Sequence, residues 1–179
     1  MTMDAAIGFR AKTGRAIAVV ISADAGAPRF VWRGEVTLAD PSAEVGPYHE
    51  VMELPWNEAT IAVRPLVAAI ESFAETAVRT LIAELKDVTI RAIGVVGSAP
   101  RNIDRIGNPH IRAHAAEGIL FRRVLELAAE RIAIPHLAFT DKELDTDVVR
   151  PLGRIVGPPW RADERLAAAA AWAALNSPA

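Results

Sequence analysis

Three residues near the middle of the chain, His110, His114 and Glu117, follow one another at steps of four and three. On a helix this spacing places them on one face. Two imidazoles and a carboxylate could ligate zinc with a position left open for water, or could act as acid and base in a hydrolase. The third interpretation is structural: His114 hydrogen-bonds a loop, and the small residues around it let the helix pack closely against a sheet. Spacing alone leaves all three open.

Further polar and aromatic residues stand where a binding site could form. Tyr48 and His49 belong to a Pro/Gly-rich stretch, where they could cover a pocket or simply anchor the loop. Trp160 follows two prolines and is either a hydrophobic plug or an aromatic platform for a ligand. Asp163 comes early in the last predicted helix, where a carboxylate also interacts favourably with the helix dipole.

Composition narrows the class of protein. The 179 residues suffice for one domain spanning 1–179, and a hydrophobic share of 51% with 23% charged residues is ordinary for a globular protein. The absence of cysteine excludes disulfides, thiolate catalysis and cysteine-ligated zinc. A net charge of −2 does not favour nucleic acid as a partner. The N-terminus lacks the apolar stretch of a signal peptide, and the longest apolar run, 166–175, is half of the roughly 20 residues needed to cross a bilayer. We therefore expect a cytoplasmic protein with no membrane contact.

The order of predicted elements indicates an α/β fold. Three strands joined by tight turns form an antiparallel meander, and helices then alternate with strands, which favours right-handed crossovers and parallel pairing. We therefore expect one five-stranded mixed sheet flanked by helices. The expected strands are 5–10, 15–22, 29–39, 88–96 and 134–139, the main helices 65–85, 110–132 and 162–175, and the principal loops 40–56, before the first helix, and 97–109.

This element order is that of the ribonuclease H-like fold. The segment "AIGFRAKTGRAIAVVI" resembles the opening strand, turn and second strand of its Holliday-junction-resolvase branch. The segments "PYH", "HAAEGILFR" and "GPPWRADERLAAAAAWAAL" together resemble a family of bacterial proteins of about this length that shares the fold and lacks most of the catalytic carboxylates. The second resemblance implies no activity.

The resolvase resemblance implies where a two-metal nuclease would hold its ions, which lie about 4 Å apart. By position, the first-strand aspartate falls at Arg10 and the fourth-strand glutamate near Gly94, while Asp163 keeps an acid on the last helix. A guanidinium cannot lose its proton, and at 4 Å it repels each unit of positive charge by roughly 4 kcal/mol at an effective dielectric of 20. We therefore expect no metal pair. Arg10 instead pairs with Asp163 or binds an anion.

The leading hypothesis is a non-nucleolytic binding or interaction protein that reuses the sheet-end pocket, with no cofactor and no metal. Its partner would be a small anionic ligand or another protein, and a homodimer through an apolar helix face is a further hypothesis. The alternative is a hydrolase or metal-dependent nuclease that uses His114, Glu117 and Asp163, with Mg²⁺ or Mn²⁺ only in that case. The residues expected to line the pocket are Arg10, Tyr48, His49, His114, Glu117, Trp160 and Asp163.

Overall fold

The computed structural model describes residues 2–42, 46–99 and 101–177. Strands and helices alternate in the order that the sequence predicts, with several short helices added. The strands are β1 (Met3–Lys12), β2 (Arg15–Asp24), β3 (Ala27–Thr37), β4 (Val88–Val96) and β5 (His136–Phe139). The helices are α1 (Pro47–Glu50), α2 (Trp56–Ala62), α3 (Arg64–Glu84), α4 (Pro109–Arg131), α5 (Gly153–Val156) and α6 (Ala162–Leu175), with 3-10 turns at Ile103–Arg105, Asp141–Glu143 and Arg150–Leu152.

The five strands form one mixed sheet in the order β3-β2-β1-β4-β5. Strands β1, β2 and β3 pair antiparallel, whereas β4 is parallel to β1 and β5 is parallel to β4. A meander followed by two parallel crossovers is the ribonuclease H-like arrangement, so the predicted fold class is confirmed. Within the described residues, no helix combines the length and the hydrophobicity needed to cross a bilayer.

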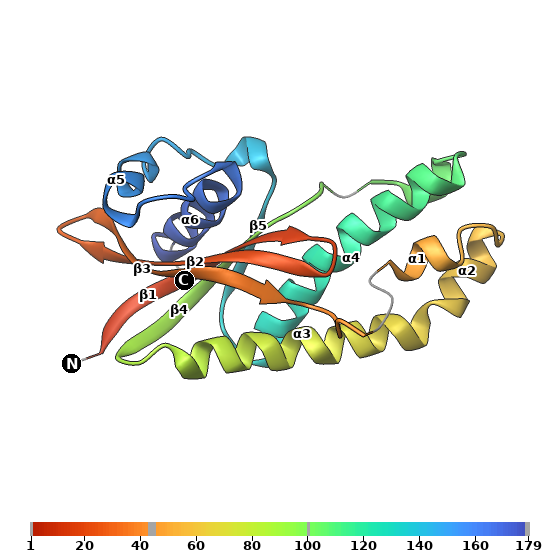
Figure 1. Cartoon of the computed structure of the whole chain (residues 1–179), viewed down its shortest axis with the longest axis horizontal. Coiled ribbons are helices and arrows are strands. Elements are labelled where there is room, and N and C mark those ends of the chain that lie inside the picture. Colours follow the sequence, from red (N-terminus) through yellow and green to blue (C-terminus); the bar gives the residue numbers. More distant parts are fainter. Residues whose placement is uncertain (1, 43–45, 100, 178–179) are drawn as a thin grey trace.

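Helices cover both faces of the sheet (Figure 1). Side chains of β1 alternate between the faces, as the two-residue period of a strand requires. Ile7 and Phe9 belong to the larger core, which the sheet shares with α3 and α4. Ala6 belongs to the smaller core beneath α6. The carboxyl ends of β1, β4 and β5 point to the same edge of the sheet because these strands run parallel.

Helix α6 lies against the sheet with almost no side chain between the two backbones. Gly8 and Gly94 face each other across β1 and β4. A Cβ atom added at Gly8 would lie 1.7 Å from the carbonyl oxygen of Ala167, and one at Gly94 would lie 2.3 Å from that of Ala170. The alanine-rich sequence of α6 is therefore explained by packing, since larger side chains would hold the helix away from the two glycines.

Two predicted loops are corrected by the structure. The stretch 40–56 contains α1 and reaches the first residue of α2, so the long helix α3 is preceded by two short ones. Helices of 4 and 7 residues make too few turns to show a helical period, which is why the sequence did not reveal them. The stretch 97–109 contains a 3-10 turn, and α4 begins one residue earlier than predicted because the Asn108 side chain accepts a hydrogen bond from the Ile111 N–H group.

Candidate functional site

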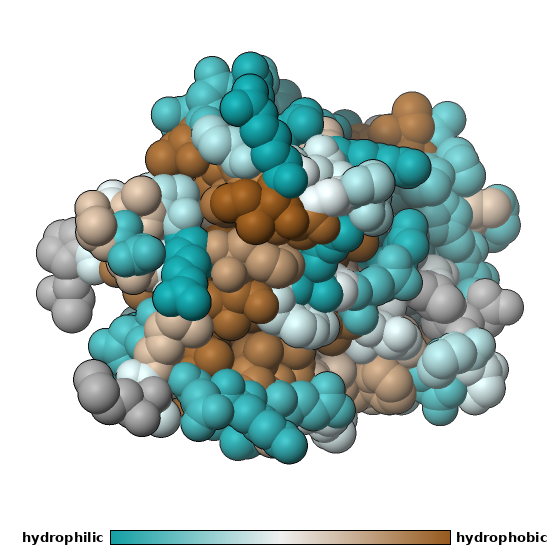
Figure 2. Space-filling view, turned by 60° about the vertical axis from the view of Figure 1, so that its left-hand side comes forward, coloured by the Kyte–Doolittle hydropathy of each residue, from teal (hydrophilic) through white to brown (hydrophobic). Residues whose placement is uncertain are grey.

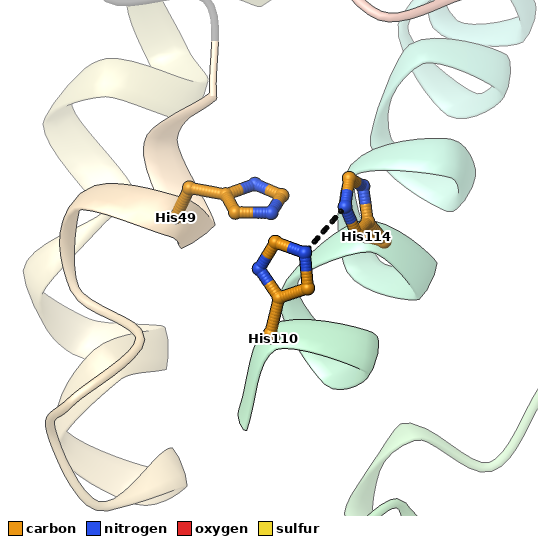
Figure 3. A group of neighbouring side chains, drawn as sticks. All are labelled: His49, His110 and His114. Carbon is orange, nitrogen blue, oxygen red and sulfur yellow. Dashed lines mark hydrogen bonds between the residues drawn. The ribbon is translucent and has the colours of Figure 1, made fainter. Parts of the chain in front are cut away.

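Three of the 4 histidines of the chain converge at the start of α4 (Figure 3). His49 comes from α1, and His110 and His114 come from successive turns of α4. One ring nitrogen of each histidine lies within 4.8 Å of the others. The Nε2 atoms of His110 and His114 are 3.1 Å apart. We call His49, His110 and His114 the histidine cluster.

Local sequence explains why these residues meet. His110 and His114 are four residues apart, so they project from one face of α4. Asn108 caps the helix and fixes where its first turn begins. Pro47 occupies the first turn of α1, where its missing N–H group is not needed. Helix α1 packs on α4, and the His49 ring lies with its centroid 4.3 Å from that of His114.

Glu117 lies behind the histidine cluster and is 2% exposed. Its Oε1 and Oε2 atoms are each 2.8 Å from His49 Nδ1, and Oε1 also accepts a hydrogen bond of 3.1 Å from the His49 backbone N–H group. The carboxylate thus fixes both the ring and the backbone of His49. The neighbouring Gly46 leaves room for this carboxylate, because a Cβ atom at that position would lie 2.9 Å from Glu117 Oε1 and the Glu117 side chain would have to shift.

These contacts indicate which tautomer His49 adopts. A carboxylate oxygen accepts a hydrogen bond, so His49 Nδ1 carries a hydrogen and donates it to Glu117. In the tautomer with its hydrogen at Nδ1, the Nε2 atom keeps its lone pair. The Nε2 atom is buried and has no hydrogen-bond partner in the part of the chain that the structure describes. Histidines that bind metals commonly donate one ring N–H to a carboxylate and use the other ring nitrogen as the ligand, which is the arrangement of His49 and Glu117. The pKa of Tyr48, the residue before His49, is raised mainly by burial and to a smaller extent by the negative charge of Glu117.

The sheet end carries a separate network of charges. Arg10 donates two hydrogen bonds to Asp141, of 2.8 Å and 3.1 Å. Its Nε atom lies 3.5 Å from Asp163, whose other oxygen is 2.9 Å from the Lys12 ammonium group. The expected contact of Arg10 with Asp163 is therefore present, but Asp141 is the main partner. Two cations and two anions balance one another at this edge.

The residues at the sheet end do not fit the metal pair that the resolvase resemblance implies. Both nearby carboxylates are already engaged by cations. The resemblance places a glutamate near Gly94, and at Gly94 itself even a Cβ atom would lie 2.3 Å from the carbonyl oxygen of Ala170 in α6. Magnesium ions need several free carboxylate or carbonyl oxygens, and among the described residues the two carboxylates beside Arg10 are not free.

The residues expected to line one pocket lie in three places. Tyr48, His49, His114 and Glu117 gather between α1 and α4, while Arg10 and Asp163 lie at the sheet end. Trp160 packs beside Gly153 and Phe30 against the smaller core, as a hydrophobic plug would. No hydrogen bond or ion pair among residues 2–42, 46–99 and 101–177 joins the histidine cluster to Arg10, Asp163 or Trp160. Lys12 and Asp141 complete the sheet-end network and were not predicted.

The described surface also contains an apolar hollow of about 720 Å³ between β3 and α3. Trp32, Val36, Phe73 and Leu81 contribute to its lining, and no histidine does. Hydrophobic surface is further visible as a band across the middle of the face in Figure 2. The hollow offers apolar surface, whereas the convergent polar atoms are those of the histidine cluster.

Comparisons with known proteins give structural neighbours only. No protein-family model matches the sequence, and no curated protein matches it. RuvC of Thermus thermophilus is similar over 93% of this chain and 90% of its own, with a TM-score of 0.49 and 12% identity. For T. thermophilus RuvC in complex with Holliday junction substrate, the similarity covers 96% of this chain and 90% of the RuvC chain, with a TM-score of 0.47 and 14% identity. An Aquifex aeolicus PPX-GPPA enzyme covers 81% of this chain and 38% of its own, with a TM-score of 0.31 and 13% identity. The fold assignment itself rests on the order and direction of the strands.

Proposed function

We propose that this chain is a metal-binding protein that holds one zinc ion through His49, His110 and His114 and does not use the chemistry of a two-metal nuclease. The observation that carries the proposal is the convergence of three imidazole nitrogens, one of them buried, unpaired and oriented by Glu117. The proposal keeps the expected non-nucleolytic binding role. It departs from the expectation of no metal and moves the site from the sheet end to the α1–α4 contact.

The spacing of the histidine cluster supports a small ion. Zinc–nitrogen bonds of 2.0–2.1 Å in a tetrahedron put neighbouring ligand atoms about 3.3 Å apart. The His110 and His114 Nε2 atoms are already 3.1 Å apart, and no pair of ligand atoms in the cluster exceeds 4.8 Å. Small rotations of the rings would therefore close the site.

The type of ligand supports zinc over the ions of nucleases. Neutral imidazole is a good ligand for zinc and neighbouring transition metals, whereas Mg²⁺ prefers oxygen. The only carboxylate that contacts the cluster among the described residues is Glu117, and it contacts His49 on the side away from Nε2. Its role is to position a ligand.

Calorimetric titration of the untagged, metal-free protein with zinc tests the proposal. We expect one zinc per chain, no binding of Mg²⁺, and a melting temperature that rises by roughly 5–11 °C at a free zinc concentration 100 times Kd, from about 2.7 kcal/mol of added stability. The His136→Ala variant removes the histidine outside the cluster and should bind like the parent. Failure to bind zinc, or Mg²⁺-dependent cleavage of a DNA junction by the purified chain, would contradict the proposal.

The variant Glu117→Gln tests how the site is oriented. The amide oxygen can still accept the His49 Nδ1 hydrogen, but the negative charge that makes the ring a stronger donor is lost. Loss of such a partner typically lowers metal affinity about 10–100-fold, so we expect zinc Kd to rise within that range while the stoichiometry stays at one. The Glu126→Gln variant, on the same helix but paired with Arg122 and Arg123, should leave zinc Kd unchanged. Equal affinities for the parent and Glu117→Gln would remove the positioning role.

A further inference from the structure

Zinc at the histidine cluster would have three protein ligands, one fewer than a tetrahedral ion takes. Within the described residues, the group of side chains able to share one ion consists of His49, His110 and His114 alone. Glu117 cannot supply the fourth ligand in this arrangement because both its oxygens are engaged by His49 Nδ1. A closed structural site would have a fourth side chain in contact with the same ion.

The remaining position is accessible. His110 and His114 are exposed, and His49 is half-buried with Glu117 behind it. The cluster is thus buried on the Glu117 side and open on the side of the first turn of α4. A small molecule can therefore reach an ion held there without moving the core.

The charge of the loaded site favours a negative donor. A zinc dication, three neutral imidazoles and the single carboxylate of Glu117 leave one net positive charge. Helix α4, which is 23 residues long, begins at Pro109, so the positive end of its dipole lies beside the cluster. A neutral donor such as water can occupy the position, but an anion gains the additional electrostatic attraction.

We infer that the zinc site, if the proposed function holds, keeps an exchangeable fourth position that takes a small monodentate anion or the carboxylate of a small-molecule ligand in place of water. The exchange is a ligand substitution: one metal–oxygen bond to water breaks, one bond to the anion forms, and no electron is transferred. Open three-histidine zinc centres of this kind are the type that supports catalysis, whereas closed four-ligand centres support structure.

Cobalt substitution tests the open position, since Co²⁺ takes zinc's place and its visible bands report on coordination. We expect azide to change the bands of the cobalt-loaded chain in a saturable way, with one azide per cobalt, and acetate or phosphate to compete with it. Competition by acetate and not by phosphate would identify carboxylates as the preferred class of ligand. Competition by phosphate and not by acetate would identify phosphates. Both results support the inference.

Two outcomes would overturn it in distinguishable ways. Cobalt and zinc that bind at one per chain, with bands that azide does not alter, would leave the proposed function standing and show that the fourth position is closed. Failure of both metals to bind would remove the proposed function and the inference together.

Discussion

Replacing His114 by alanine is expected to raise the zinc Kd by more than about 100-fold. Loss of a residue that only orients a metal ligand already costs about 10–100-fold in affinity, and His114 would contact the ion directly. The same result is expected for His110→Ala, whose ring nitrogen lies 3.1 Å from that of His114. Competition with a chromophoric chelator measures zinc affinities over the required range. Both side chains are exposed, so the free energy of unfolding of each metal-free variant should lie within about 0.5 kcal/mol of that of the metal-free parent.

The matched control is again His136→Ala, which removes an imidazole from β5 and should leave the zinc Kd unchanged. A His114→Ala variant that binds zinc as tightly as the parent would show that the ion, if any, is held elsewhere. A variant that loses zinc binding and also unfolds would be uninformative by itself, and His110→Ala supplies the second, independent measurement. Loss of zinc affinity in both variants with an unchanged melting temperature of the metal-free protein is the expected pattern.

The histidine pair on α4 could be predicted from the sequence because residues four positions apart on a helix lie on the same face. His49 could not be added to it, since its position depends on how a loop far away in the sequence folds over α4. Glu117 was predicted as a ligand or as an acid–base group from its place three residues after His114. In the structure Glu117 is buried behind His49, with both oxygens against Nδ1, and the spacing of residues along a helix does not reveal the burial of a single residue.

The sheet could be predicted more fully than the charges at its edge. Runs of β-branched residues separated by short turns identified the strands, and the alternation of helices with strands in the second half indicated parallel crossovers. Asp141 was missed, although a general rule could have found it, since the residues at the carboxyl ends of parallel strands gather at one edge. Asp141 comes two residues after the end of β5, and Lys12 is the last residue of β1. Lys12 lies two residues after Arg10, on the same face of the strand, and that spacing was the other available signal.

The contact of α6 with the sheet leads to a prediction about stability. Gly8→Ala is expected to lower the free energy of unfolding by about 3 kcal/mol or more, the upper end of the usual cost of overpacking, because the new methyl group meets the backbone of Ala167 at 1.7 Å. A backbone atom cannot move aside as a flexible side chain can, so α6 must shift away from the sheet. For a chain of this length, 3 kcal/mol corresponds to a fall in melting temperature of roughly 6–12 °C.

Gly94→Ala should behave alike, and Gly94→Glu should be worse, because a longer side chain would have to displace α6 near Ala170. Gly107→Ala is the matched control: no atom lies within 4 Å of its added methyl group, so the melting temperature should stay close to that of the parent. Thermal unfolding followed by circular dichroism distinguishes the variants. If Gly8→Ala and Gly94→Glu had the same melting temperature as Gly107→Ala, α6 would not pack as closely on the sheet as described. A carboxylate on the fourth strand would then be compatible with this fold. If both variants melt well below Gly107→Ala, a carboxylate side chain at Gly94 is incompatible with the close packing of α6 on the sheet. That incompatibility is the physical reason to look for the chemistry of this chain at the histidine cluster.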